Sequence, residues 1–437
     1  MSENYKLVLG LEIHLHLKTK TKMFCGCSAD FYDKEANTHT CPVCLGLPGA
    51  LPVANYEAVR KTQLLGLALG CKLNTNSKFD RKHYFYPDLP KGYQISQYKE
   101  PLCEGGSLQL TSGVFCEIER IHLEEDTAKS MHEGEHTLID FNKSGMPLVE
   151  IVTKPTFKSV EDAVEFCKKI QDLVRLLEIG DVDMEKGQMR LEANISVRTQ
   201  EMETSNILPK YKVEVKNINS FRFMEKAVRY EFKRQSELLS NSEKVVQENR
   251  GWDESLGQTV SQREKEEAHD YRYFPEPDLP PMVFSDEYLK KLSSELPELP
   301  WVKKARLIKQ YGLSDSVALL LSSTDNKVIL EKFESIVKAG IDPSKVANLL
   351  LNKLEYRELS TSDFVSKYKS ENSKLTDTIL ISEAVDRVLT SNLKSIQEYR
   401  KGKLSVIEFL VGMAMRELKG KADANVVRGL ISEKLNL

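Results

Sequence analysis

The sequence predicts an α+β protein, in which a β-sheet domain with flanking helices is followed by all-α helical domains. Two observations support this fold class. Strict alternation of apolar and polar residues, the pattern of a strand with one side in the core, recurs in several tracts before residue 290. From about Ser285 the pattern changes to helical periodicity, and the proline-punctuated segment Leu296–Pro300 marks a hinge between domains.

The chain has 437 residues, of which 41% are hydrophobic and 29% are charged, so it can bury a large core in two or three domains. The formal net charge of −3 provides no overall basic field. A nucleic-acid partner would therefore have to meet local basic patches or another subunit. No apolar run approaches the roughly 18 residues that span a bilayer, and the N-terminus has no signal or transit pattern. We expect a cytoplasmic protein that does not bind membranes.

The first strand is predicted between Tyr5 and Leu17, where every second residue is apolar. The polar side of this strand carries Glu12, His14 and His16. A carboxylate and imidazoles on one exposed face can take part in chemistry. A half-buried strand with hydrogen-bonded histidines would show the same pattern, so the alternation alone leaves both interpretations open.

Two close thiol pairs follow, Cys25-Gly-Cys27 and Cys41-Pro-Val-Cys44, separated by 13 residues. Tetrahedral zinc needs four thiolates that two tight turns bring together, and Gly26 and Pro42 suit such turns. We predict a structural zinc ion bound by Cys25, Cys27, Cys41 and Cys44. A redox role for the second pair is the main alternative, but its surroundings lack the strand–helix context of a thioredoxin motif.

A helix is expected between Leu45 and Leu73, and a proline-rich loop follows between Ser77 and Ser96. This loop interleaves basic residues with aromatic ones. Such a combination suits contact with a nucleotide or with an RNA end. A rigid loop that caps the sheet is an equal alternative. Part of the same sequence pattern, aromatic residues followed by prolines and an aspartate, recurs at Asp270–Pro280.

The tract Ile118–Lys129 begins as a strand and ends in Glu124, Glu125 and Asp126, where the period of two is lost. Successive acids at a strand end can bind a hard cation such as Mg²⁺, although a plain acidic turn would look the same. Leu148–Val152 reads as a buried strand, and Ser159 as the cap of the helix that follows.

The strongest strand signal runs from Gln188 to Arg198, and Lys212–Lys216 repeats its alternation before Asn217–Ser220. Acids, bases and amides share the polar faces of these two strands. Together they can hold a metal ion and a polyphosphate, although a solvated face with cross-strand ion pairs would have the same composition. A second helix is expected from Ser220 to about Leu239, and Gln247–Trp252 reads as a strand and loop that return to the sheet.

The last unit is expected from Ile379, where Lys and Arg outnumber Asp and Glu by ten to seven. This excess is weak support for contact with an RNA backbone, and a solvated helical surface explains it equally well. Ser405–Glu408 predicts a capping box at the start of an apolar helix, and Asp423 predicts the cap of the terminal helix.

Nine short tracts in the first 290 residues form a combination of motifs that is specific to one family: Gly10–His14, Ser77–Lys82, Tyr84–Asp88, Tyr93–Gln97, Leu123–Asp126, Val149–Val152, Arg190–Ser196, Glu214–Ser220 and Asp270–Asp278. The chain closely resembles the GatB family, the B subunits of the tRNA-dependent amidotransferases. The tail resembles the family's C-terminal module through Phe409–Met413 and Lys419–Ala422, although the segment between Asn348 and Ile379 is shorter than usual. The four clustered cysteines resemble those of the zinc-bearing members.

The resemblance implies a cradle-like catalytic domain with a mostly antiparallel sheet over residues 1–290, including a zinc lobe near 25–44. A helical domain over 291–378 and a YqeY-like tail over 379–437 that contacts tRNA would follow. The family uses ATP to phosphorylate the side-chain carboxylate of Glu on tRNA(Gln), or of Asp on tRNA(Asn). Ammonia, which a partner amidase releases from glutamine, then forms the amide. The implied partners are the amidase subunit GatA and the small subunit GatC in a heterotrimer, together with misacylated tRNA.

The polar strand faces are the candidate phosphate site, because the chain has neither a P-loop nor the protein-kinase motifs. We expect one Mg²⁺ ion, bridging the ATP phosphates, at Glu12, His14, Glu124, Glu125 and Glu192. The expected catalytic residues are Glu125, Glu124, His14 and Lys216. The expected ATP-binding residues are Arg190, Asn194, Arg198, Glu214, Lys216, Asn217 and Asn219. The ammonia passage or the substrate end is expected at Lys78, Asp80, Arg81, Lys82, Tyr84 and Asp88.

A noncatalytic RNA-binding scaffold, in which the zinc and the acid clusters are purely structural, is the alternative from another functional class. The choice between Asp and Glu as substrate stays open, because both need the same activation chemistry. No glutamine-hydrolysing nucleophile is evident in the sequence.

Overall fold

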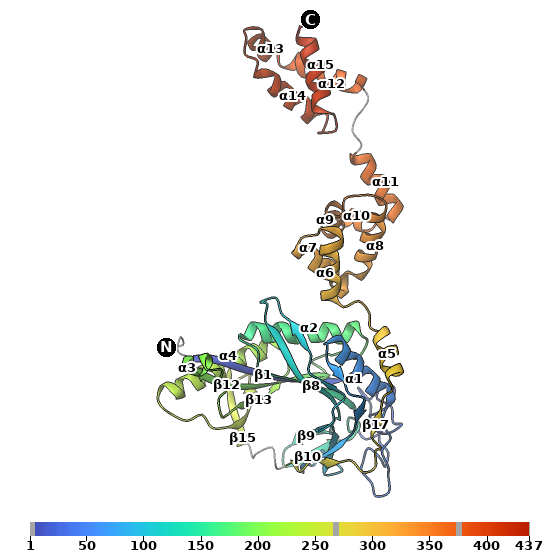
Figure 1. Cartoon of the computed structure of the whole chain (residues 1–437), viewed down its shortest axis with the longest axis vertical. Helices are drawn as coiled ribbons and strands as arrows, with labels where there is room; N and C mark the ends of the chain where they lie inside the picture. Colours follow the sequence, from blue (N-terminus) through green and yellow to red (C-terminus); the bar gives the residue numbers. More distant parts are fainter. Residues whose placement is uncertain (1–4, 265–270, 373–377, 437) are drawn as a thin grey trace. The chain divides into compact units, whose positions relative to one another are not determined.

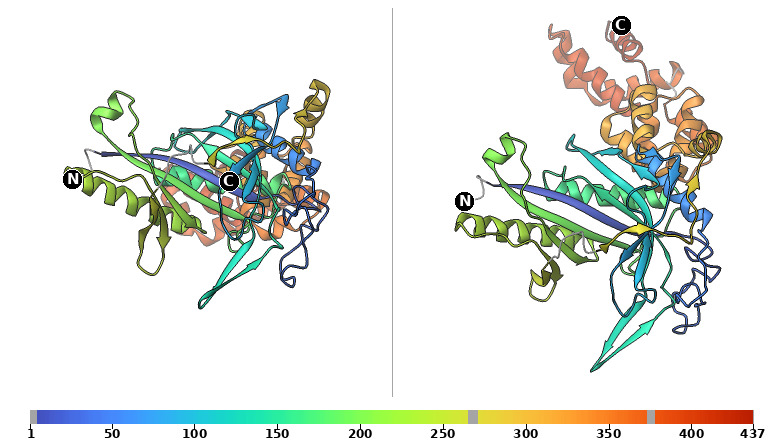
Figure 2. Two further views of the ribbon diagram at one scale, coloured as in Figure 1. Left: turned by 90° about the horizontal axis from the view of Figure 1, so that it is seen from below. Right: turned by 60° about the horizontal axis from the view of Figure 1, so that its bottom comes forward.

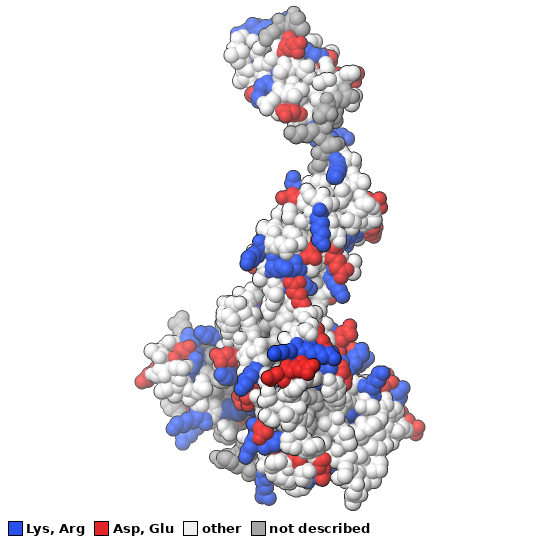
Figure 3. Space-filling model, turned by 45° about the vertical axis from the view of Figure 1, so that its right-hand side comes forward, with Lys and Arg blue, Asp and Glu red and all other residues white. Residues whose placement is uncertain are grey.

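The computed structural model describes residues 5–264, 271–372 and 378–436. The chain divides into two compact units, Met1–Leu299 and Pro300–Leu437 (Figure 1). The first unit contains a mostly antiparallel sheet with flanking helices and the second is helical, which confirms the predicted α+β class. On the face shown in Figure 3, basic and acidic side chains are interspersed. Among the described residues, no helix is long and apolar enough to cross a membrane.

The main sheet is built outward from β1 (Tyr5–His16), which pairs antiparallel with β11 (Pro147–Thr153) on one side and β12 (Met189–Thr199) on the other. Beyond β11 lie β8 (Phe115–Glu125), β6 (Cys103–Glu104) and β2 (Lys72–Leu73), and β7 (Ser107–Gln109) also pairs with β8. Beyond β12 lie β13 (Val213–Ile218), β14 (Glu248–Asp253) and β15 (Gln258–Glu264). β13 and β14 pair in parallel.

Two long helices, α2 (Val160–Leu176) and α4 (Phe221–Ser240), cover one face of this sheet (Figure 1). Both begin where the sequence predicts. Ser159 Oγ accepts a hydrogen bond from the amide of Asp162, and Ser220 Oγ accepts one from the amide of Phe223. The apolar residues of β1 and β12 lie under these helices and are buried. The polar residues of the same strands therefore share the opposite face.

Shorter elements border the polar face. β4 (Asp80–His83) pairs with β5 (Tyr93–Ser96) and β16 (Phe274–Pro275), and β3 (Asn76–Ser77) pairs with β17 (Met282–Val283). The hairpin of β9 (Lys129–Glu133) and β10 (His136–Asp140) projects from the body (Figure 2). Three helices complete the unit: α1 (Tyr56–Ala68), α3 (Gln200–Thr204) and α5 (Asp286–Ser294). Because α5 packs on α1 and spans residue 290, the first compact unit extends past the expected boundary to Leu299.

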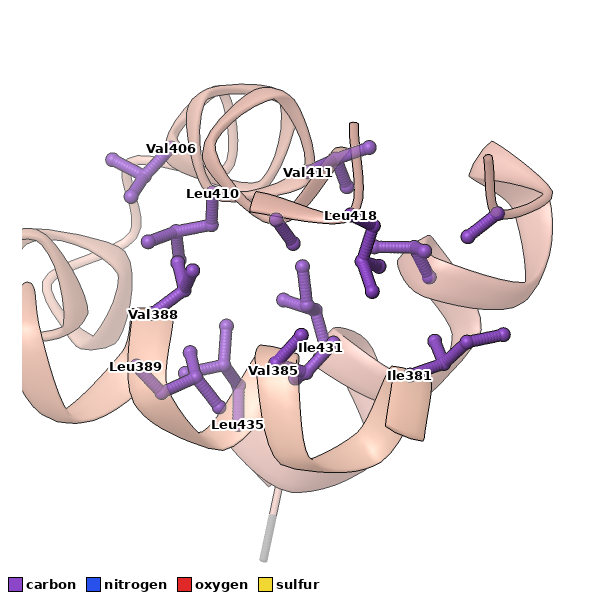
Figure 4. Packing of buried hydrophobic residues seen from close by; sticks show 14 residues of the cluster. Ile381, Val385, Val388, Leu389, Val406, Leu410, Val411, Leu418, Ile431 and Leu435 are labelled. Atoms are coloured by element: carbon purple, nitrogen blue, oxygen red, sulfur yellow. The ribbon is translucent and has the colours of Figure 1, made fainter. Parts of the chain in front are cut away.

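The second unit has two separate cores. One core is formed by α6 (Pro300–Tyr311), α7 (Asp315–Ser322), α8 (Lys327–Lys338), α9 (Pro343–Asn352), α10 (Leu354–Arg357) and α11 (Thr361–Asn372), with a short 3₁₀ helix at Thr324–Asn326. The other core, shown in Figure 4, is formed by α12 (Thr378–Ser391), α14 (Val406–Glu417) and α15 (Ala424–Asn436), with α13 (Leu393–Arg400) beside them. Each group of helices thus buries its own apolar cluster.

The predicted capping box at Ser405 is wrong. Ser405 already has helical backbone angles (φ −63°, ψ −14°), and its side chain accepts no capping hydrogen bond. A capping serine needs an extended backbone to direct its oxygen at the first free amides of the helix. Asp423 does cap its helix, because its Oδ1 accepts a hydrogen bond from the amide of Asn425 at 2.8 Å.

A buried carboxylate ties α4 to the sheet edge. The side chain of Glu231 is fully buried and accepts hydrogen bonds from Arg234 Nε at 3.1 Å and from Thr259 Oγ1 at 2.8 Å. Arg250 Nε lies 3.5 Å from the same carboxylate. One helix residue therefore holds both β14, through Arg250, and β15, through Thr259.

We predict that Glu231→Gln lowers the free energy of unfolding by about 3 kcal/mol, because it removes the fully buried carboxylate that pairs with Arg234 and Arg250 and leaves Glu248 as their remaining carboxylate partner among the described residues. Urea unfolding, followed by the fluorescence of Trp252 in β14 with Trp301 replaced by Phe, measures the change. Glu225→Gln is the matched control, since Glu225 lies on an exposed turn of the same helix. Identical unfolding midpoints for the two variants would contradict the assigned role of Glu231.

Candidate functional site

The register of the central strands gathers acidic side chains on the polar face of the sheet. In β1, Glu12 lies opposite Glu192 of β12, and His14 lies opposite Glu150 of β11. Further along the sheet, Glu214 of β13 is paired with Asn194 of β12. Residues that are far apart in the sequence therefore become neighbours on one surface.

The first cluster, called here the histidine–acid group, consists of His14, Glu124 and Glu150. One ligand atom from each lies within 4.8 Å of the others. His14 Nε2 is 3.6 Å from Glu150 Oε2 and 3.9 Å from Glu124 Oε2. His122 Nε2 contacts the same two carboxylates at 3.1 Å and 3.4 Å. Ser96 Oγ donates to Glu124 Oε1 at 2.7 Å and fixes its orientation.

Charges within this group balance one another. Burial disfavours ionised Glu150, but the imidazoles of His122 and His14 outweigh burial and hold the pKa of Glu150 well below its usual range. Burial also lowers the pKa of His14, yet the carboxylates, Glu150 first, outweigh it and raise that pKa to about 9. His14 is therefore protonated at neutral pH, and a metal ion that binds its nitrogen must displace this proton.

The second cluster, the three-acid group, consists of Glu12, Glu192 and Glu214, again with ligand atoms within 4.8 Å of one another. Lys216 Nζ bridges it at 2.9 Å from Glu192 and 2.9 Å from Glu214. Asn194 Nδ2 donates to Glu12 Oε1 at 2.8 Å. Burial, followed by the charges of neighbouring carboxylates, raises the pKa of Glu12. The group is electrostatically crowded and gains from another cation.

A further carboxylate, that of Asp126, lies outside both groups and directly follows the end of β8. Asp126 Oδ2 is 2.6 Å from His16 Nε2 and 3.2 Å from an Arg190 guanidinium nitrogen, and its Oδ1 accepts a hydrogen bond from Lys143 Nζ at 3.0 Å. Burial disfavours ionised Asp126, but Arg190 and Lys143 outweigh it and hold the pKa well below its usual range. Arg190, an expected phosphate ligand, is thus positioned at the rim of the acidic face by a charged partner.

Glu125 is placed apart from the other expected magnesium ligands. Consecutive strand residues point to opposite sides. Glu125 accordingly forms an ion pair with Lys91 and accepts a hydrogen bond from the amide of Ile95 at 3.0 Å. The structure brings Glu12 and Glu192 into one group and His14 and Glu124 into another, while Glu125 belongs to neither.

The residues expected at the ammonia passage or the substrate end fall into two kinds. Three of them have structural partners: Lys78 pairs with Glu100 at 2.7 Å, the buried Asp80 accepts a hydrogen bond from the amide of Tyr98 at 3.0 Å, and Arg81 binds Glu276 with two hydrogen bonds of 2.8 Å. Asp88 is half-buried, and its carbonyl accepts a hydrogen bond from the amide of Ala128.

Lys82 and Tyr84 face the histidine–acid group. Lys82 Nζ lies 6.0 Å from the ring centre of Tyr84 and 5.0 Å from that of Tyr271. Among the described residues, Lys82 forms no ion pair. Burial lowers its pKa, but the charges of Glu124 and Glu150 outweigh burial and raise the pKa well above its usual value. This ammonium group is available to an anionic ligand.

Three expected ATP-binding residues lie away from the acidic groups. Arg198 pairs with Glu203 near the far end of β12. Asn217 is exposed with a left-handed backbone (φ 60°), and Asn219 lines a surface depression with Gln171 and Arg175 of α2. The irregular pairing between β12 and β13 changes the side-chain alternation here, which the strand pattern alone does not reveal.

Glu150 and His122 were not among the residues expected at the site. A signal for Glu150 was present, because a glutamate in the otherwise apolar strand Pro147–Thr153 is buried only where cations compensate it. His122 lies two residues before Glu124 on β8 and therefore on the same side of the strand. Their partners come from other strands, so only the sheet order identifies both roles.

The four clustered cysteines meet in space. One sulfur atom from each of Cys25, Cys27, Cys41 and Cys44 lies within 4.8 Å of the others, so the cluster can hold a metal ion. The Cys41 and Cys44 sulfurs are 3.9 Å apart, and Lys22 Nζ is 3.6 Å from Cys44 Sγ. Hydrogen bonding from Cys25, assisted by the charge of Lys22, lowers the pKa of Cys44 to about 4.

Comparison with known proteins agrees with this architecture. A family model described as the GatB/GatE catalytic domain matches residues 7–290, and one described as a GatB domain matches residues 357–435. The chain is 42% identical to the B subunit of an aspartyl/glutamyl-tRNA(Asn/Gln) amidotransferase from Thermodesulfovibrio yellowstonii, with 98% of each chain covered. It is 41% identical to the proteins of that name from Thermotoga maritima and Thermomicrobium roseum, with 99% of each chain covered. The chain therefore belongs to the GatB family of tRNA-dependent amidotransferase subunits.

Proposed function

We propose that this chain activates the side-chain carboxylate of Glu on tRNA(Gln), or of Asp on tRNA(Asn), with ATP and then forms the amide. The observation that carries the proposal is the polar sheet face, where the histidine–acid group and the three-acid group adjoin the cations Lys82, Arg190 and Lys216. Charge neutralisation and positioning are the main requirements of phosphoryl transfer. The names of the relatives supply the substrate class.

The reaction needs two displacements. A carboxylate oxygen of the substrate attacks the γ-phosphorus of ATP, the bond to the ADP oxygen breaks, and an acyl phosphate forms. Ammonia then attacks the acyl carbon, and phosphate leaves with that carboxylate oxygen. We assign Lys82 to the anionic substrate and Lys216 with Arg190 to the phosphates. Asn194 orients the carboxylate of Glu12, which lies at the edge of the proposed phosphate site.

The acid groups fit divalent cations. Glu12, Glu192 and Glu214 offer only oxygen ligands, the set that Mg²⁺ prefers, while the histidine–acid group adds one imidazole nitrogen. When bound, Mg²⁺ neutralises the charge that develops on the phosphates. Glu125 is a weaker candidate for this role because it lies outside both acid groups and pairs with Lys91, and we propose that it joins β8 to β5 and to the loop before β5.

Ammonia must come from elsewhere. Glutamine hydrolysis needs an activated nucleophile. The four clustered cysteines are better used as metal ligands, and Cys71, Cys103, Cys116 and Cys167 are buried. We propose an amidase partner, GatA, and a small partner, GatC, in a cytoplasmic heterotrimer. The tail from residue 379 is proposed to contact the tRNA body with its basic residues, and Lys78 and Asp88 are proposed to border the ammonia passage.

The proposed function is tested with the chain copurified with its partner subunits. ATP, glutamine and misacylated tRNA together should give amidated tRNA, and phosphate release should depend on the misacylated tRNA. The chain alone should release no glutamate from glutamine. RNA binding without tRNA-dependent phosphate release would instead identify a noncatalytic scaffold.

Glu124→Gln should lower tRNA-dependent phosphate release about 10²–10³-fold, the scale for losing one charged contact to the transition state. Affinity for the tRNA should stay within about twofold, because Glu124 lies at the phosphate rather than along the RNA. Glu117→Gln is the control, since Glu117 lies on the same strand but is exposed and pairs with Lys154 at 2.8 Å. Equal turnover of the two variants would remove Glu124 from the site.

We expect one zinc ion per chain, bound by the four clustered cysteines, because four closely spaced thiolates form a closed tetrahedral site. Elemental analysis after dialysis against a chelator should find zinc in the wild type and little in Cys44→Ser, whose melting temperature should also fall. Cys71→Ser removes an unclustered buried thiol and should keep its zinc. Wild-type protein without zinc, or Cys44→Ser with a full zinc content, would refute the assignment.

A further inference from the structure

Beside the acidic face, aromatic side chains are exposed in one area, called here the aromatic patch. Its members come from the ends of β4, β5 and β16, which form one three-stranded sheet. Their exposed fractions are high for such large side chains: Phe85 85%, Tyr86 52%, Tyr98 47% and Tyr271 36%. Exposed aromatic residues are common singly, but a contiguous group marks a binding surface.

The rings of the patch support one another. Tyr98 stacks on Tyr273 with centroids 4.3 Å apart, Tyr273 meets Tyr271 at 6.2 Å, and Tyr271 meets Tyr84 at 6.2 Å. Tyr84 in turn meets Tyr86 at 5.9 Å. The rings are therefore held in place by each other. Because these side chains are already ordered, binding a flat ligand on them costs little additional side-chain entropy.

Phe85 is the most exposed ring of the patch and joins it through the chain, between Tyr84 and Tyr86. Among the described residues no ring contact holds it, and its position is constrained instead by the backbone at Gly92. Gly92 has a left-handed backbone (φ +72°), and a Cβ atom at that position would come within 3.3 Å of the Phe85 ring. The ring thus lies against bare backbone on one side and remains open on the other. That arrangement suits stacking with another flat group.

The patch is joined directly to the reaction site. Tyr84 Oη donates a hydrogen bond to Gln94 Oε1 at 3.4 Å, and Gln94 Nε2 donates one to Glu124 Oε2 at 3.3 Å. Lys82 lies over the rings of Tyr84 and Tyr271 and adds positive charge at the inner edge of the patch. A ligand on the patch can therefore place its end beside the histidine–acid group.

These observations select one occupant. Stacking on aromatic rings beside a cation is the mode by which proteins bind single-stranded RNA, and it requires no particular base. The substrate of the proposed function carries its amino acid on the unpaired 3′ end of a tRNA. We propose that the aromatic patch binds the unpaired 3′-terminal bases of the aminoacylated tRNA by stacking, with Phe85 as an outer contact. This inference rests on the proposed function and names the part of the substrate that this surface recognises.

A thermodynamic cycle between protein and RNA tests the inference. The complex of the chain with its partner subunits is titrated with intact tRNA and with tRNA trimmed of its unpaired 3′ nucleotides, at one salt concentration. Phe85→Ala should weaken binding of intact tRNA about tenfold, or about 1.4 kcal/mol, and should leave binding of trimmed tRNA unchanged. Phe85→Trp, which keeps a large ring, should bind intact tRNA like the wild type.

Phe115→Ala is the matched control, because Phe115 is 56% exposed at the opposite end of β8 from Glu125. It should bind both RNAs like the wild type. An equal loss for intact and trimmed tRNA in Phe85→Ala would overturn the inference and place the contact elsewhere on the RNA. Loss of the partner subunits from that variant would also overturn it and would assign the patch to a protein contact. If the wild-type complex amidates misacylated tRNA while Phe85→Ala and removal of the 3′ nucleotides change the affinity independently of each other, the inference fails and the proposed function stands. If the wild-type complex neither binds nor amidates the tRNA, the proposed function fails with it.

Discussion

The physical constraint on which this structure depends is the two-sided nature of its central strands. Alternate residues of β1 are apolar and lie under α2 and α4, so the remaining residues, which include Glu12, His14 and His16, must share the other face. Antiparallel neighbours on both sides of β1 then bring Glu150 beside His14 and Glu192 beside Glu12 on that face. Acids that repel one another at this short range are held together because the hydrophobic face of each strand fixes its register.

That concentration of negative charge explains the basic residues around it. His122 lies against Glu124 and Glu150, Lys216 bridges Glu192 and Glu214, and Lys143 contacts Asp126. Each cation offsets the cost of burying a carboxylate. A surface in which charges are arranged in this way before a ligand arrives needs little reorganisation when a polyphosphate and its metal ions bind. The aromatic patch adjoins the same face, so the proposed recognition of the RNA end and the proposed carboxylate activation use neighbouring surfaces.

Much of this arrangement could be predicted from the sequence, for identifiable reasons. Strict alternation located β1, β12 and β13, serine caps located α2 and α4, and the paired cysteines indicated their own cluster. The division of the acids into two groups could not be predicted. It depends on strand order, which local patterns do not contain, and on the irregular pairing of β12 with β13 near Asn217 and Asn219. Glu125 illustrates this limit of sequence-based prediction. A run of consecutive acids in the sequence does not show which of their side chains lie on the same face of the sheet. The capping box at Ser405 failed because its local pattern did not match the backbone that packing imposes.

The central claim, that the polar sheet face activates a carboxylate by phosphorylation, has a direct isotopic test. Misacylated tRNA whose amino-acid side-chain carboxylate carries ¹⁸O at both oxygens is incubated with the complex, ATP and glutamine, and the released phosphate is analysed by mass spectrometry. The account predicts one ¹⁸O atom in each phosphate formed with the amide, because the acyl phosphate oxygen that leaves began in the carboxylate. Amide formation with unlabelled phosphate would contradict an acyl phosphate and with it the role assigned to this face.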